Sequence, residues 1–312
     1  PNSWRWNGGM KGRKGSTDEG GVRTPLFMKW PERIKAGTNF KQIASVIDLL
    51  PTLVDLAGVE YDYPKPLDGI SLKDLIMEED PQWSDRIIFN QWRDRVSARD
   101  QRFRLDHRGI LYDIDNDRGQ TIDVSSTYPE IREKLETARA AYLSEVVTEL
   151  PEEDDRTFPL GHPDSRYTQI PARDGVAHGN IERSNRWPNC SFFTNWTSLQ
   201  DSITWEVEVQ QAGEYQVTLY YTCKPGDEGS VFQLTHGNSR LESTIELAHD
   251  PPLTGMENDR VERPESYVKD FMPMDIGKIQ LEQGKGLLTL KATEMPGNSV
   301  MDVRLLFFER VH

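Results

Sequence analysis

The residues best suited to chemistry lie close together near the start of the chain. Three basic residues, Lys11, Arg13 and Lys14, fall within four positions of the glycine-rich loop 7–25. Glycine tolerates backbone conformations with φ > 0, so main-chain N–H groups of such a loop can approach an anion closely. The whole chain has a formal net charge of -14, and a basic loop in an acidic protein predicts a small anionic group as its ligand. A solvated basic turn is the alternative.

This loop does not have the pattern of a nucleotide-binding P-loop. The order Lys14-Gly15-Ser16 fails the G-x-x-x-x-G-K-[ST] pattern, and no hydrophobic strand precedes it. Nucleic acid is not expected as a partner either, because binding a phosphate backbone requires a basic surface.

Short elements that must position the loop follow it in sequence. The apolar residues 26–30 and 43–47 each predict a short buried strand. Apolar residues recur at helical spacing between Asp48 and Gly58 and predict a helix. Asp48 is expected to cap its start and Gly58 to end it. Together these elements predict the edge of an α/β sheet.

The order and spacing of these segments resemble a known family. Residues 12–31 followed by residues 47–58 resemble the second half of the catalytic domain of type I sulfatases, members of the alkaline-phosphatase-like superfamily. The resemblance implies that residues 1–60 are the C-terminal end of an α/β catalytic domain. It also implies that Lys14 contacts the sulfate group, with Lys11 and Arg13 facing either substrate or solvent.

The family uses two groups that this chain does not carry. Sulfatases have a formylglycine nucleophile, made from a Cys/Ser-x-Pro-x-Arg motif, and a calcium ion bound by acidic and amide side chains. Neither Cys190 nor Cys223 starts such a motif. The resemblance therefore implies a C-terminal portion of a sulfatase, with calcium and formylglycine in the complete enzyme, the N-terminal part of the sulfatase as a partner, and no activity for this chain alone.

Residues 61–150 predict a small α+β subdomain. Residues 86–90, 96–99, 103–105 and 109–113 have the pattern of short strands, and residues 129–150 that of one long helix. This arrangement resembles the C-terminal subdomain of sulfatases, an antiparallel sheet with a helix packed on it. In the family this region often approaches the cleft, which makes Trp92 and Arg93 candidate substrate contacts, against the alternative of a packing Trp and a surface Arg.

One acidic segment in this region has the spacing of a metal site. Asp113, Asp115 and Asp117 are spaced as in an EF-hand, but the glycine falls at loop position 7 and Val124 stands where the bidentate glutamate belongs. The sequence therefore predicts a turn, and no metal ligand is assigned.

Beyond an acidic, proline-rich linker at residues 151–165, residues 166–312 predict an all-β jelly-roll-like sandwich. Apolar and polar residues alternate in short runs with glycine turns, at 203–209, 215–221, 279–281, 288–292 and 303–308. The amino-acid sequence of these runs resembles that of carbohydrate-binding β-sandwich modules, which are often appended to polysaccharide-processing enzymes.

Several aromatic residues of the sandwich are candidates for stacking on a sugar ring. Trp205 is in phase with its apolar neighbours and is expected in the core. Trp187, Trp196 and Tyr220 are out of that phase or in loops, and are possible glycan contacts. Residues 249–271 predict an unusually long loop, of a kind that is usually functional or disordered.

The sequence also bears on location and on the state of the cysteines. No apolar run is long enough to span a membrane, and a periplasmic or extracellular location is implied by the family resemblance alone. Cys190 and Cys223 could pair or remain two free thiols.

The resemblances together predict hydrolysis of a sulfate ester on a sulfated carbohydrate. A non-catalytic carbohydrate-binding protein with a vestigial sulfatase segment is the alternative. A phosphoryl-transfer relative from the same superfamily is weaker, because it would need zinc ligands that the sequence does not show.

Overall fold

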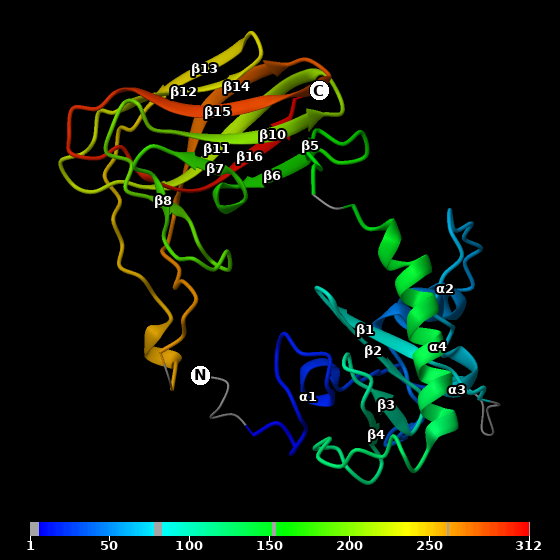
Figure 1. Cartoon of the computed structure of the whole chain (residues 1–312). Helices are drawn as coiled ribbons and strands as arrows, with labels where there is room; N and C mark the ends of the chain where they lie inside the picture. Colours follow the sequence, from blue (N-terminus) through cyan, green and yellow to red (C-terminus); the bar gives the residue numbers. More distant parts are fainter. Residues whose placement is uncertain (1–5, 78–82, 152–153, 261, 312) are drawn as a thin grey trace. The chain divides into compact units, whose positions relative to one another are not determined.

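The computed structural model describes residues 6–77, 83–151, 154–260 and 262–311. The chain divides into two compact units, Asn2–Glu153 and Asp154–His312. We refer to them as the N-terminal and the C-terminal unit; Figure 1 shows their elements.

The N-terminal unit contains a four-stranded antiparallel sheet in the order β1-β2-β3-β4. The strands are β1 (Ile88–Trp92), β2 (Arg95–Arg99), β3 (Phe103–Leu105) and β4 (Leu111–Asp113). Helix α4 (Pro129–Glu145) packs on β2 and β3, and Leu135 of the helix is fully buried. A short 3-10 helix, η3 (Val147–Glu149), follows it. The sheet and helix confirm the small α+β arrangement expected from the sequence.

The two faces of this sheet differ in chemistry because side chains alternate along a strand. On one face Ala98, Phe103 and Leu105 form a small apolar core with Leu135. Ser97 and Arg104 are buried too, but they lie one residue out of phase with those apolar residues. The second face is therefore built to hold a polar segment.

Residues 6–60 do not form the expected edge of an α/β sheet. Among the described residues of this range the structure has only the helices α1 (Glu19–Val22), η2 (Val46–Asp48) and α2 (Leu49–Ala57). The strands expected at 26–30 and 43–47 are absent, because a strand needs a neighbour to satisfy its backbone hydrogen bonds and no described strand lies beside them. Helix α2 confirms its prediction, and Gly58 ends it with φ 64°.

Part of residues 61–77 is also helical. Helix α3 spans Lys73–Met77 and buries Leu75. It contacts α2, so this helix is packed within the unit.

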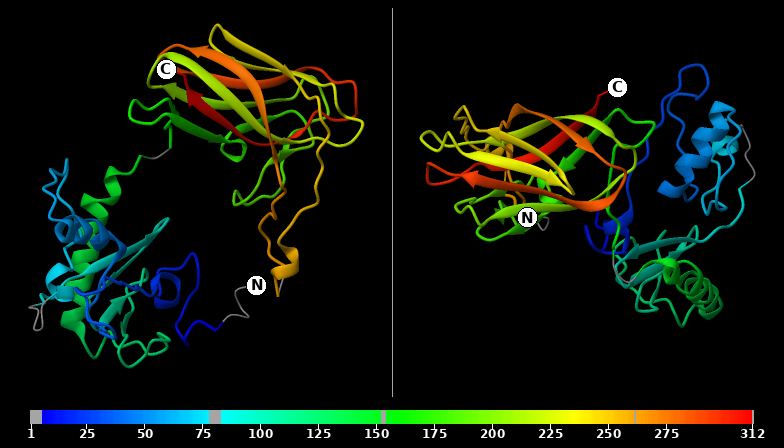
Figure 2. Two further views of the ribbon diagram at one scale, coloured as in Figure 1. Left: turned by 180° about the vertical axis from the view of Figure 1, so that it is seen from behind. Right: turned by 90° about the horizontal axis from the view of Figure 1, so that it is seen from above.

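The C-terminal unit is a sandwich of two six-stranded sheets, seen as two layers in Figure 2. One sheet has the order β13 (Ser239–Thr244), β12 (Val231–His236), β15 (Gly284–Glu294), β10 (Ser202–Val209) and β5 (Phe158–Leu160), with β7 (Val176–His178) also paired to β10. The other has the order β14 (Met272–Leu281), β11 (Gly213–Thr222), β16 (Asp302–Arg310), β9 (Phe193–Thr194) and β8 (Glu182–Arg183), with β6 (Tyr167–Pro171) paired to β16.

The sandwich confirms the all-β prediction but moves two boundaries. Strand β5 lies within the stretch expected as a linker and pairs in parallel with β10, so the sandwich begins before residue 166. Strand β15 begins before the run expected at 288–292, since Gly284 already pairs with Val209 of β10. Trp205 is 1% exposed in the core, as expected.

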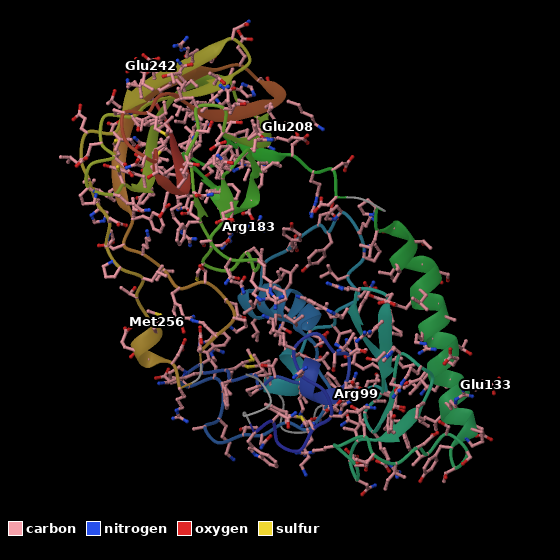
Figure 3. All side chains as sticks on the ribbon, turned by 60° about the vertical axis from the view of Figure 1, so that its left-hand side comes forward. Arg99, Glu133, Arg183, Glu208, Glu242 and Met256 are labelled. Atoms are coloured by element: carbon pink, nitrogen blue, oxygen red, sulfur yellow. The ribbon has the colours of Figure 1, made fainter. Side chains whose placement is uncertain are left out.

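A long connection leaves the sandwich between β13 and β14. Within its described residues the structure places the short helix η5 (Met256–Asn258) and two isolated bridges, one between His249 and Cys223 and one between Thr254 and Val268. Figure 3 labels Met256 on this projecting segment. The connection agrees with the long loop expected at residues 249–271.

Candidate functional site

The basic loop presents two of its three cations to solvent. Arg13 and Lys14 are exposed, and neither side chain makes a hydrogen bond or ion pair with another described residue. Gly15, which follows, has φ 86°, a conformation that favours glycine. The loop therefore holds two charges that are free to meet an anion.

The side chain of Lys11 contacts other residues of the unit. Its Nζ donates to the hydroxyl of Tyr112 at 3.1 Å, lies 4.7 Å from the centre of that ring, and is 3.9 Å from the carboxylate of Asp18. These contacts tie the loop to β4. They leave Lys11 a worse candidate for substrate contact than Arg13 or Lys14.

A buried ionic network fixes the loop on the polar face of the sheet. Glu19 is fully buried and accepts from Arg99 of β2 at 2.5 Å and from Nε of Arg104 of β3 at 3.0 Å. Arg104 also donates to the carbonyl of Thr17 at 2.9 Å, and Ser97 donates to the same carbonyl at 2.9 Å. Arg99 is labelled near α1 in Figure 3.

Glu19 stays ionised because of these partners. Burial by itself would raise the pKa of its carboxyl group, but the Arg104 and Arg99 guanidinium groups outweigh burial and hold the pKa below the ordinary value. The loop after Lys14 is thus held by a charge pair rather than by an apolar core.

The other predicted contact of this unit lies beside the loop. A Cβ atom built on Gly15 would lie 3.6 Å from Nε1 of Trp92, so the indole at the end of β1 packs against the loop next to Lys14. Trp92 keeps 48% of its surface exposed. Arg93 follows in the turn between β1 and β2 with φ 56°. The structure therefore places Trp92 against Gly15, the residue that follows Lys14, although the two are far apart in sequence.

The aromatic residues proposed for the sandwich do not form one platform. Trp187 is 42% exposed, with the Arg186 guanidinium 4.8 Å from its ring centre. Tyr220 is half-buried on β11. Trp196 is only 1% exposed, so the expectation that its ring stacks on a sugar is wrong. Its loop carries the ring into the core of the sandwich.

The acidic segment after β4 is a hydrogen-bonded turn. Asp113 accepts from Arg102 at 2.6 Å and from the side chain of Asn116 at 2.8 Å. The Arg102 guanidinium is the main cause of a lowered pKa for Asp113. Among the residues that the structure describes, no three His, Cys, Asp or Glu side chains are grouped to hold a metal ion.

The two cysteines are free thiols. Cys223 is buried, and burial raises the pKa of its thiol to about 11. A thiol with such a pKa is a weak nucleophile at neutral pH.

Comparisons with known proteins identify the N-terminal unit. Residues 14–141 match the family described as "N-sulphoglucosamine sulphohydrolase, C-terminal". Over these residues the chain is similar to the C-terminal region of sulfatases. The match begins at Lys14 and runs through the sheet and most of α4.

Individual sulfatases agree with this assignment over short stretches. The steryl-sulfatase of Mus musculus is 32% identical over 84 residues, covering 27% of this chain and 14% of that protein. The arylsulfatase of Clostridium perfringens is 38% identical over 78 residues, covering 24% of this chain and 16% of that protein. The N-acetylgalactosamine-6-sulfatase of Canis lupus familiaris is 36% identical over 98 residues, covering 31% of this chain and 18% of that protein. The chain thus spans less than a fifth of each of these sulfatases.

Solved structures give only distant likenesses. A GH26-CBM35 mannanase from Podospora anserina aligns at 11% identity and a TM-score of 0.33, covering 47% of this chain and 28% of that one. The C-terminal CBM6 of LamC from Zobellia galactanivorans aligns at 9% identity and a TM-score of 0.32, covering 46% of this chain and 99% of that one. These scores are too low to assign a ligand. No helix in the described part of the sulfatase segment or of the sandwich is long and apolar enough to cross a membrane.

Sequence reasoning missed the residues that position the loop. Arg104 lies between Phe103 and Leu105, and a charged residue inside this short apolar strand was the only signal; Arg99 ends β2, which also contains Arg95 and Ser97, and gave none. Glu19 lies in the loop, but Arg99 and Arg104, which pair with it, are some 80 residues away in sequence.

Proposed function

We propose that this chain is the C-terminal portion of a sulfatase that hydrolyses sulfate esters of a glycan, and that Lys14 contacts the sulfate group. The observation that carries the proposal is an exposed lysine, unpaired among the described residues, on a loop fixed by a buried Glu19–Arg104 pair in a sulfatase segment.

The role of Lys14 follows from the charge that moves during ester cleavage. As the S–O bond breaks, negative charge grows on the sulfate and leaving-group oxygens, and a fixed ammonium nearby stabilises it. The loop is attached to the sheet through Glu19, so the backbone that carries Lys14 need not be ordered when substrate binds. Arg13 and Trp92 flank Lys14 and are candidates for contacts with the sugar that carries the sulfate.

The remaining chemical groups of a sulfatase do not fit the residues of this chain. Cys190 and Cys223 are followed by Ser-Phe-Phe and Lys-Pro-Gly rather than by the sequence that is converted to formylglycine. The described carboxylates form no group suited to calcium. We therefore expect the nucleophile and the calcium site to be supplied by the N-terminal part of the sulfatase, and this chain alone to be inactive.

Exposed apolar side chains support the proposal that this chain contacts the N-terminal part of the sulfatase. They concentrate between residues 26 and 59, and they are Leu26, Phe27, Met28, Trp30, Phe40, Val46, Ile47, Leu50, Leu53 and Val59. A large exposed apolar surface on a globular protein usually marks a contact with another protein surface. The strand patterns at 26–30 and 43–47 would find sheet neighbours in the rest of an α/β domain.

A sulfated glycan is a better substrate proposal than a small aryl sulfate. One of the relatives is named for a sulfated sugar, and the chain continues into a β-sandwich of carbohydrate-binding appearance. This step rests on analogy with other proteins. By the same analogy we place the complete protein in the periplasm or outside the cell.

The test compares Lys14→Ala with Lys35→Ala, an equally exposed lysine of the same unit, in the protein that carries the N-terminal sulfatase part. Release of sulfate from sulfated monosaccharides is the readout. Loss of one charge-stabilising donor typically lowers kcat by about 100-fold or more. The kcat of Lys14→Ala should therefore fall by that factor, while the kcat of Lys35→Ala should stay near the wild-type value. Equal rates of sulfate release for the two variants would contradict a contact between Lys14 and the sulfate group.

A non-catalytic carbohydrate-binding protein is the second candidate. It is favoured by the two-sheet sandwich that makes up the C-terminal unit. An intact-mass measurement separates the two: a single species near 35.8 kDa without a second polypeptide favours binding alone, and a formylglycine-containing partner favours the sulfatase.

A further inference from the structure

The segment that follows Lys14 runs along β2 on the polar face of the sheet. Ser97 of β2 donates to the carbonyl of Thr17 at 2.9 Å. Two residues further along both segments, Arg99 donates to the carboxylate of Glu19 at 2.5 Å. Because alternate side chains of a strand lie on one face, the polar side chains of β2 meet successive alternate residues of the loop. Strand and loop therefore have a fixed register.

Arg95 is the preceding residue of β2 in this register. It lies on the same face as Ser97, two residues later, and directly opposite Trp92 of β1. Trp92 contacts the loop at Gly15, since a Cβ atom built there would lie 3.6 Å from its Nε1. Arg95 therefore lies at the level of Gly15, the residue that follows Lys14.

The guanidinium group of Arg95 is available to a ligand. Arg95 is exposed and makes no hydrogen bond or ion pair with another described residue. Asp94 of the neighbouring turn is exposed, whereas Asp18 of the loop already lies 3.9 Å from Lys11. The exposed cations at this place are Arg13, Lys14, Arg93 and Arg95. In a chain of net charge -14, such a concentration of positive charge favours a ligand with more than one negative charge.

We propose that Arg95 binds a second anionic group of the substrate, so that the Lys14 site prefers glycans with a carboxylate or a further sulfate beside the sulfate ester. This inference rests on the proposed function of Lys14. A guanidinium group presents parallel N–H donors that match the paired oxygens of such anions. The exposed part of the Trp92 ring, in contact with Gly15 and opposite Arg95, offers the sugar an apolar surface beside both charges.

The exposure of Arg95 determines the form of this selectivity. A singly charged sugar leaves the guanidinium group in water, as it is in the free protein, and loses nothing. A doubly charged sugar gains a charge-assisted hydrogen bond. The preference is therefore a gain for the doubly charged sugar, and it should shrink at high salt, which screens exposed charges.

The test follows the indole N–H of Trp92 by ¹H–¹⁵N NMR on the full chain. The sequence has 8 tryptophans, and Trp92→Phe identifies the cross-peak. Two pairs of ligands that differ by one anionic group are titrated. One pair is N-acetylgalactosamine 6-sulfate and its 4,6-disulfate; the other is the disaccharide of glucuronate and N-acetylgalactosamine 6-sulfate and its carboxyl methyl ester. We expect at least one doubly charged ligand to bind about tenfold or more tightly than its partner, the value of one charge-assisted hydrogen bond.

The pair that shows the preference tells whether a second sulfate or a carboxylate is bound. Arg95→Ala should abolish the preference and leave the weaker binding of the singly charged ligand unchanged. Arg95→Lys keeps the charge without the fork of donors and should retain part of the preference. Lys134→Ala removes the same charge from the exposed side of α4, which packs on the other face of the sheet, and should keep the preference whole.

The proposal is overturned if neither doubly charged ligand is preferred, if Arg95→Ala keeps the preference, or if Lys134→Ala loses it equally. Sulfate release by the complete protein tests Lys14 separately. A loss of kcat in Lys14→Ala with an unchanged preference in Arg95→Ala would overturn the role of Arg95 alone. Normal kcat in Lys14→Ala with a preference that depends on Arg95 would overturn the catalytic role of Lys14 and support the second anion site.

Discussion

At the scale of single residues, the most consequential feature is a carboxylate that never reaches solvent. Glu19 is fully buried between two arginines that come from neighbouring strands. A buried ion pair adds little compared with a well-packed apolar substitute, but removing one partner leaves charges buried without compensation. Glu19 therefore mainly fixes the position of the loop. It adds little to the stability of the unit compared with apolar residues packed at the same place.

We expect Glu19→Gln to destabilise the N-terminal unit by roughly 3–5 kcal/mol, because Arg104 would remain buried without a counter-charge. Glu133→Gln, on the exposed side of α4 and labelled in Figure 3, is the matched control and should change stability little. Urea unfolding followed by hydrogen exchange of the β2 and β3 amides measures both. Similar stability for the two variants would contradict the bridging role of Glu19.

The same network predicts a dependence on pH. The pKa of Glu19 in the folded unit lies below the ordinary value of 4.5, since Arg104 and Arg99 outweigh burial. The stability that the ionised carboxylate contributes is therefore complete above pH 4.5 and is lost as pH falls through the folded pKa.

The free-energy difference between wild type and Glu19→Gln should accordingly shrink when the pH is lowered below 4.5 and stay constant above it. Unfolding curves at a series of pH values give this difference directly. A difference that grows on acidification would mean that the carboxyl group is protonated in the folded unit at neutral pH.

At the scale of elements, helix α2 shows a face without a described partner. Leu50 and Leu53 are 52% and 59% exposed, whereas the polar Thr52 is buried and donates to the carbonyl of Asp48 at 2.6 Å. Asp48 itself pairs with both guanidinium nitrogens of Arg86, at 2.8 and 2.9 Å. Polar contacts thus attach α2 to the unit, and its leucines point elsewhere.

We expect Leu53→Lys to leave the unfolding free energy of the chain within about 0.5 kcal/mol, as for other exposed positions, and to reduce its self-association. Leu75→Lys, at a residue 4% exposed in α3, should instead unfold the unit, because it buries an unpaired charge. Sedimentation velocity and thermal unfolding report the two effects. If Leu53→Lys were as damaging as Leu75→Lys, the exposed face would not be a contact surface for the N-terminal sulfatase part.

At the scale of the whole molecule, the two units solve different structural problems. The C-terminal unit has a large apolar core between two sheets, and buried Asp201 and Asp227 accept hydrogen bonds from its loops. The N-terminal unit has a small core on one face of its sheet and an ionic network on the other. The first is therefore expected to fold without a partner, and the second to gain most from one.

Local patterns in the sequence were sufficient for much of this architecture. The alternation at 203–209 and 215–221 predicted β10 and β11, and the spacing over 129–150 predicted α4. The order of residues after Lys14 indicated a sulfatase segment, which the family comparison supports. In each case the signal lies within one element or one loop, where backbone geometry and side-chain periodicity act over a few residues.

Only the tertiary structure decided which distant residues meet. It placed Trp92 against Gly15 and surrounded Glu19 with Arg99 and Arg104, contacts that no periodicity encodes. It left residues 26–30 without a described strand neighbour, and it buried Trp196 in the core of the sandwich. The reason is that burial, ion pairing and strand pairing depend on what the rest of the chain brings to a residue, whereas a sequence pattern records only what the residue itself prefers.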